Sequence, residues 1–151
     1  MTFLLITKLD EDLKMDNNWD VYIRIPGIIP SKKNRMRVYR GRVVKDESVR
    51  NAEALIQTQA ILAMSEAGLE PFDGPIALEV ICFYDDRRRR DAHNVLGSLC
   101  DALEDIVYHD DNQIVDCHVS KRFCEKGHPE TFVYVWALEE HPDFYPISQK
   151  K

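Results

Sequence analysis

Four consecutive arginines lie between two aspartates and an Asp-Ala-His-Asn tetrad in the stretch DDRRRRDAHN, residues 85–94. Carboxylates and guanidinium groups this close together are typical of a metal-dependent phosphodiester site. The carboxylates can hold a divalent cation that activates water, and the arginines can bind phosphates that the carboxylates alone would repel. The structural alternative is a solvated turn in which these charges only balance one another.

A second pair of carboxylates, Asp110 and Asp111, follows further along the chain, just before a predicted strand. If the intervening helix and turn return the chain to the helix start, Asp91 and Asp111 face one point and can share a metal ion. Taken alone, Asp91 is typical of a helix N-cap, and an acidic pair is typical of a turn. The combination with the arginines favours a metal site over these separate structural roles.

Hydrophobic periodicity predicts the elements that must position these residues. Alternating apolar residues predict strands over residues 19–25, 75–84, 114–123 and 131–139. Apolar spacings of three or four predict one helix from about residue 46 to 67 and another from Asp91 to Ile106. The basic stretch around Gly41 predicts a loop or irregular hairpin. This order predicts a single small α+β domain, in which a mixed sheet of about four strands packs with two main helices.

Composition and charge distribution limit the classes of function that the chain can have. The chain has 151 residues and a net charge of −6, which argues against a general nucleic-acid coat protein. However, basic residues concentrate in residues 32–50 and in the arginine run, so the sequence predicts a basic groove compatible with nucleic acid. No apolar run approaches the ~20 residues that span a bilayer. The opening MTFLLITKLDEDLK has no basic region ahead of its apolar stretch, so we expect an N-terminal extension of a cytoplasmic protein and no secretory signal.

The segments DRRRRDAHN and CDALEDIVYHDDNQIVD resemble the core of the RusA-type Holliday junction resolvases. That core has a basic run, then D-x-D-N, then D-A-L, then D-D-x-Q-[IV] before a strand. The upstream segment IPGIIPSKKNRMRV is similar to the family's strand–proline–asparagine opening. The resemblance implies an N-terminal extension over residues 1–18, a RusA-like endonuclease domain over residues 19–140 and a C-terminal tail over residues 141–151.

The resemblance also implies an activity. It implies a homodimeric, bacterial or prophage-encoded endonuclease of DNA recombination and repair, which binds four-way DNA junctions. With Mg²⁺, such an enzyme nicks two opposing strands symmetrically. A two-fold dimer matches the approximate two-fold symmetry of the junction, because it provides one site for each cut strand.

Individual residues can be carried over from the family motif. Asp91 and Asp111 match metal-binding catalytic aspartates, and Asn94, Asp101 and Gln113 match flanking motif positions. The residues for which the resemblance implies DNA contact belong to the two basic segments: Lys32, Lys33, Asn34, Arg35, Arg87, Arg88, Arg89 and Arg90.

Two positions depart from the family pattern. His93 stands at the position of the second metal-binding aspartate, and Gly97 stands at the position of a lysine. A neutral imidazole is a poor ligand for Mg²⁺ and suits Mn²⁺ better, and the lysine would have steadied transition-state charge. Three readings follow: His93 is a catalytic ligand of Mn²⁺, Asp86 or Asp110 replaces the missing carboxylate, or the chain is a non-catalytic or weakly catalytic branched-DNA-binding protein.

Overall fold

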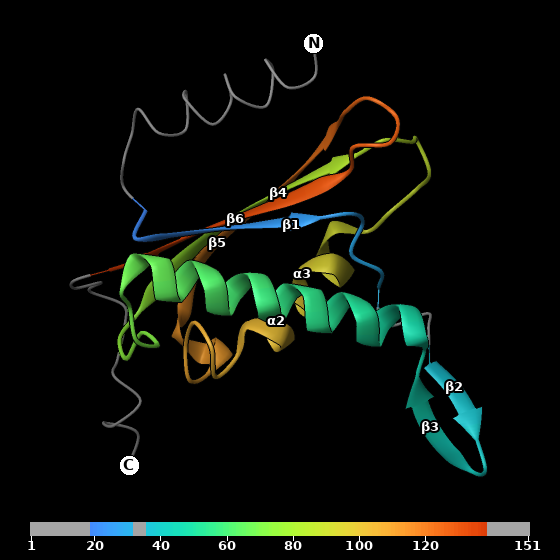
Figure 1. Ribbon diagram of the computed structural model, residues 1–151, viewed down its shortest axis with the longest axis horizontal. Coiled ribbons are helices and arrows are strands. Elements are labelled where there is room, and N and C mark those ends of the chain that lie inside the picture. The colour runs from blue at the N-terminus through green and yellow to red at the C-terminus, as the bar shows by residue number, and fades with distance from the viewer. Residues whose placement is uncertain (1–18, 32–35, 139–151) are drawn as a thin grey trace.

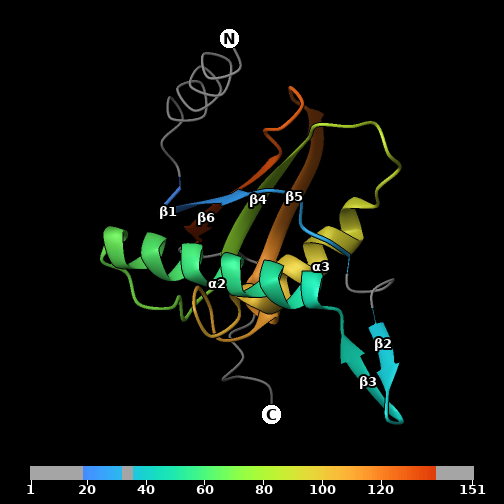
Figure 2. The ribbon, with the colours of Figure 1, turned by 45° about the vertical axis from the view of Figure 1, so that its right-hand side comes forward.

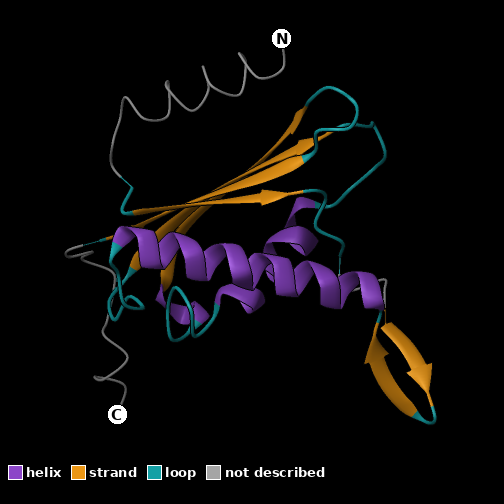
Figure 3. Ribbon diagram, viewed as in Figure 1, coloured by secondary structure: helices purple, strands orange, loops and turns teal. Residues whose placement is uncertain are grey.

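The computed structural model describes residues 19–31 and 36–138. Figure 1 shows these elements, and Figure 3 separates helices, strands and loops by colour. In chain order they are β1 (Val21–Pro26), β2 (Met36–Tyr39), β3 (Arg42–Lys45), α2 (Glu47–Ala67), β4 (Ile76–Tyr84), α3 (Ala92–Leu103), the 3-10 helix η2 (Asp111–Gln113), β5 (Ile114–Phe123) and β6 (Glu130–Ala137).

The main sheet has the strand order β1-β6-β4-β5. β6 runs antiparallel to both β1 and β4, whereas β4 and β5 are parallel neighbours whose register pairs Ile76 with Ile114 and Tyr84 with Phe123. Two adjacent parallel strands need a crossover connection, and α3 provides it. α3 therefore runs back along the sheet, so residues before it lie at one end of the sheet and residues after it lie at the other.

The two faces of the sheet differ in what covers them. Figures 1 and 2 place α2 and α3 on the same face, and the main core lies between these helices and the strands. Its largest fully buried aliphatic side chains include Ile23, Ile25, Ile56, Ile76, Leu78, Leu99 and Leu103. The opposite face carries an aromatic cluster packed around Ile81, which comprises Trp19, Tyr22, Phe83, Phe132, Tyr134 and Trp136.

β2 and β3 form a separate two-stranded hairpin beside the N-terminal end of α2 (Figure 1). Its two turn residues, Arg40 and Gly41, have φ values of 50° and 73°. Positive φ at both positions is typical of the type I′ turn, whose twist matches that of a tight hairpin. The expected hairpin with Gly41 at its turn is therefore confirmed.

The predicted α+β class, with a mixed four-stranded sheet and two helices, is also confirmed. One boundary was wrong: α3 ends at Leu103 and does not reach Ile106, because the backbone leaves the helical conformation at Glu104, whose ψ is 140°, and Asp105 then adopts a left-handed φ of 68°. The predicted extension (1–18), the tail (141–151) and the polar residues 32–35 lie outside the described residues. Within the described part of the chain, neither helix is long and apolar enough to cross a membrane.

Candidate functional site

The arginine run lies in the loop that joins β4 to α3, and one of its members is used to hold that loop. The Arg90 guanidinium donates to both carboxylate oxygens of Asp86, at 2.5 Å to Oδ1 and 3.0 Å to Oδ2. It also lies over the ring of Tyr84, 4.6 Å from the ring centre. The hydrogen bond from Arg90, aided by the Arg88 backbone N–H, lowers the pKa of the Asp86 carboxyl to about 2. Arg90 and Asp86 thus form a charged pair that fixes the loop over β4.

The other three arginines have more open surroundings. The guanidinium of Arg87 lies over the exposed ring of Phe123, 4.9 Å from its centre. Arg88 and Arg89 are exposed and line a groove beside the loop, and the Arg88 side chain is 83% exposed. Arg88 and Arg89 can therefore reach a phosphate in the groove, whereas Arg90 is engaged within the loop.

The groove encloses about 1170 Å³ between the end of β1, the first turns of α2, the arginine loop and the start of α3. Six of the residues singled out from the sequence line it together: Asp86, Arg88, Arg89, Arg90, Asp91 and Asn94. Ser48, Asn51 and Lys121 also line it and were not predicted. No local pattern distinguishes these three, because they resemble ordinary first-turn helix residues and a solvent-facing strand residue.

Asp91 lies in this groove at the start of α3. Its Oδ1 accepts the backbone N–H of His93 at 2.9 Å, and its Oδ2 lies 3.4 Å from Nδ2 of Asn94. Asp91 is therefore the N-cap of α3, the structural role that its position at a helix start is typical of. His93 and Gly97 are both exposed, and a Cβ added at Gly97 would meet no atom within 4 Å. A lysine could thus stand at position 97 without a clash.

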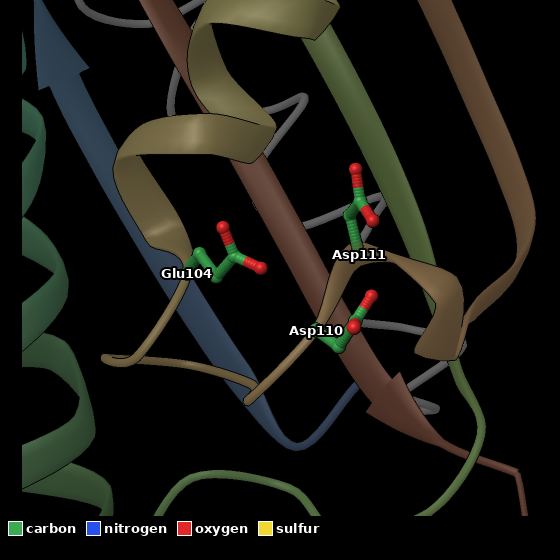
Figure 4. A group of neighbouring side chains, drawn as sticks. All are labelled: Glu104, Asp110 and Asp111. Atoms are coloured by element: carbon green, nitrogen blue, oxygen red, sulfur yellow. The ribbon is translucent and has the colours of Figure 1, made fainter. Parts of the chain in front are cut away.

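A cluster of three carboxylates, Glu104, Asp110 and Asp111, lies at the other end of α3 (Figure 4). One carboxylate oxygen from each lies within 4.8 Å of the others. The pKa of Glu104 is raised, first by partial desolvation and then by neighbouring carboxylates, chiefly that of Asp111. The negative end of the α3 dipole adds to this repulsion. A divalent cation, which prefers oxygen ligands, would relieve it.

The D-D-x-Q motif explains how the turn presents Asp111. Gln113 is 1% exposed, and its side-chain oxygen accepts two backbone N–H groups of the turn, at 2.8 and 2.9 Å. Its side-chain nitrogen donates to the carbonyl oxygen of Phe72 at 2.6 Å. Asp110 caps η2 by accepting the Asn112 N–H at 2.8 Å. These bonds fix the turn and leave the carboxylate of Asp111 exposed.

The structure does not bring Asp91 and Asp111 together within one chain. Asp91 caps the start of α3 and Glu104 follows its end, and a helix of 12 residues is about 18 Å long. The closure considered from the sequence therefore does not occur within one protomer, because α3 runs back along the two parallel strands that it joins. Of the two candidate replacement carboxylates, Asp110 lies beside Asp111, whereas Asp86 is held by Arg90. Glu104 was missed, although it directly follows the D-A-L motif.

Arg89→Ala and Arg90→Ala should have different consequences. Arg89→Ala should weaken DNA binding and reduce its salt slope by about 1, as expected for one lost phosphate contact, with an unchanged melting temperature. Arg90→Ala should lower the melting temperature by about 3 °C, because it leaves Asp86 without its bidentate partner. Binding titrations at several salt concentrations, paired with thermal melts, test both. An unchanged melting temperature and a larger affinity loss for Arg90→Ala would assign Arg90 to DNA instead.

Comparison with known proteins places these features in a family. The family model described as "Endodeoxyribonuclease RusA" matches residues 26–135, which span the arginine loop, both ends of α3 and the carboxylate cluster. No curated protein matches the chain. Since the family match covers most of the sequence, the chain belongs to the RusA endodeoxyribonuclease family.

Proposed function

We propose that this chain is a metal-dependent, structure-selective endonuclease that resolves four-way (Holliday) DNA junctions by paired, symmetric phosphodiester hydrolysis. It would act in the cytoplasm, in DNA recombination and repair. Family membership supports endonuclease activity on DNA. The observation that carries the proposal is the placement of the charged groups: Asp91 lies in a groove with Arg88 and Arg89, and a three-carboxylate cluster lies at the opposite end of the same helix.

We propose further that the active form is a homodimer whose two sites are shared between subunits. Within one protomer the carboxylates are divided between the two ends of α3, so neither end alone holds both Asp91 and Asp111. If a two-fold axis brings the start of α3 in one subunit to the end of α3 in its partner, the same symmetry also brings the start of the partner's α3 to the end of α3 in the first subunit. The dimer then has two identical sites, one for each strand that a symmetric cut requires.

The residues at each shared site fit a hard divalent cation. Asp111 would bind Mg²⁺ together with Asp91 of the partner subunit, and Glu104 and Asp110 lie close enough to contribute oxygens. Such a cation supplies an activated water and neutralises charge on the phosphate. His93, in the first turn of α3, would add a nitrogen ligand that favours Mn²⁺. Arg88 and Arg89 would bind the phosphates on either side of the scissile bond.

The decisive experiment is cleavage of a labelled four-way junction, with a linear duplex of the same sequence as control, in Mg²⁺ and separately in Mn²⁺. We expect paired nicks in opposing strands of the junction and none in the duplex. If His93 is a ligand, Mn²⁺ supports the faster reaction, and His93→Asp with Gly97→Lys shifts the preference toward Mg²⁺. Tight junction binding without nicks in either metal would contradict the endonuclease proposal and favour a non-catalytic branched-DNA-binding protein.

A further inference from the structure

The β2–β3 hairpin exposes apolar side chains on a basic element. Val38, Tyr39 and Val43 are 76%, 62% and 67% exposed, which is half of the large hydrophobic residues found exposed among the described residues. Arg40 and Arg42 flank them at the turn. Clustered exposed apolar residues rimmed by polar ones commonly mark a binding surface.

The register of the hairpin sorts these side chains into two faces. Val38 pairs directly with Val43, and Tyr39 pairs with Arg42. Successive strand residues point to opposite faces, so the valine pair lies on one face and the Tyr39–Arg42 pair on the other. The guanidinium of Arg40 lies 5.4 Å from the centre of the Tyr39 ring. The tip of the hairpin therefore presents an aromatic ring beside two positive charges.

The hairpin is attached next to the groove. β3 ends at Lys45 and α2 begins at Glu47, and Ser48 and Asn51 in the first turns of α2 line the groove opposite the arginine loop. Figures 1 and 2 show the hairpin extending away from the sheet at this end of α2. A nucleic acid that occupies the groove and continues past the start of α2 would meet the hairpin tip.

The side chains at the hairpin tip indicate which kind of ligand can bind there. Arg40 and Arg42 attract phosphates, whereas Tyr39, Val38 and Val43 need an apolar surface, which in DNA is offered by the faces of bases. In a continuous duplex these faces are covered by stacking. At the branch point of a four-way junction, base pairs can lose a stacking neighbour and expose a face.

We propose that the β2–β3 hairpin inserts at the branch point and that the Tyr39 ring stacks on a base exposed there, while Arg40 and Arg42 hold the adjacent phosphates. The proposal rests on the junction-binding function proposed above and assigns the selection of branched over linear DNA to this hairpin. It is independent of cleavage, because none of its residues belongs to the carboxylate cluster or to the groove.

The test uses the full chain and a four-way junction that carries 2-aminopurine at the branch point, in a chelating buffer where no cleavage occurs. Binding of the wild type should raise the fluorescence, because unstacking relieves quenching. Tyr39→Thr keeps a strand-forming residue but removes the ring, and should bind the junction about tenfold more weakly with loss of the fluorescence rise. Its affinity for linear duplex should be unchanged. Tyr39→Phe should behave as the wild type, and so should Ile61→Ser, which alters an exposed apolar residue on α2.

The outcomes separate this inference from the proposed function. A wild type that binds neither junction nor duplex would overturn the proposed function. A wild type that binds the junction without a fluorescence change, or a Tyr39→Thr variant that equals it in both readouts, would overturn only the hairpin proposal. Equal weakening of junction and duplex binding would also overturn it, because it would indicate a contact with ordinary duplex. Thermal melts verify that each variant is folded.

Discussion

Asp91→Asn should abolish junction cleavage while the fold and junction binding remain intact. Asparagine caps a helix about as well as aspartate, so the side-chain oxygen can still accept the His93 N–H that begins α3. The amide lacks the negative charge with which a carboxylate binds a hard cation. We expect a loss of at least about 100-fold in nicking rate, since even an outer-shell partner of a bound metal typically costs 10–100-fold.

The measurement is the rate of junction nicking with protein in excess, in Mg²⁺ and in Mn²⁺, together with the melting temperature and the junction affinity in chelating buffer. Asp116→Asn is the matched control, because it neutralises an exposed carboxylate on β5 that lies outside the groove and the carboxylate cluster. Unchanged nicking by Asp91→Asn would leave Asp91 as a helix cap only. If the melting temperature of Asp91→Asn also falls, the loss of activity would be explained by unfolding of the start of α3.

The local elements of this fold could be predicted because their signals are local. Val21, Ile23 and Ile25 alternate with polar residues, and the structure buries all three on one face of β1. The helix α2 ends where Gly68 adopts a left-handed φ of 66°, as the position of that glycine predicted. Such patterns depend on the side-chain periodicity of one segment and need no knowledge of its neighbours.

The relation between Asp91 and Asp111 could not be predicted in the same way. It depends on β4 and β5 being parallel neighbours, and strand order is decided by packing among segments far apart in the chain. Once the two strands are parallel, α3 must return along the sheet, and the residues at its two ends cannot meet. The short segment between Asp91 and Asp111 suggested that their carboxylates meet, whereas the direction of α3 keeps them apart.

The different roles of the four arginines could not be predicted from the sequence either. Asp86 and Arg90 are four residues apart, a spacing that predicts a contact in a helix but none in a loop. Their contact depends on the loop folding back over the ring of Tyr84. In a similar way, Glu104 lies near Asp111 because the backbone leaves the helix at Glu104, about one turn earlier than the apolar spacing indicated.

Mixing the Asp91→Asn and Asp111→Asn variants should restore cleavage that neither variant has alone. If each site combines Asp91 of one subunit with Asp111 of the other, a mixed dimer has one site with both substitutions and one site with none. Random exchange makes half of the dimers mixed, and each has one intact site of two, so nicking should recover to about one quarter of the wild-type level. The products should be junctions nicked in a single strand, because the second site of each mixed dimer is inactive.

The matched control mixes Asp91→Asn with the double variant Asp91→Asn/Asp111→Asn, in which no combination of subunits contains an intact shared site. Differently tagged subunits, co-purified before the assay, verify that exchange has occurred. Recovery only in the first mixture would show that the two ends of α3 meet across the dimer. Absence of recovery despite verified exchange would mean that each site lies within one subunit. Because α3 keeps Asp91 and Asp111 about a helix length apart in one chain, that result would require either a large rearrangement on binding DNA or a metal site formed without one of these aspartates.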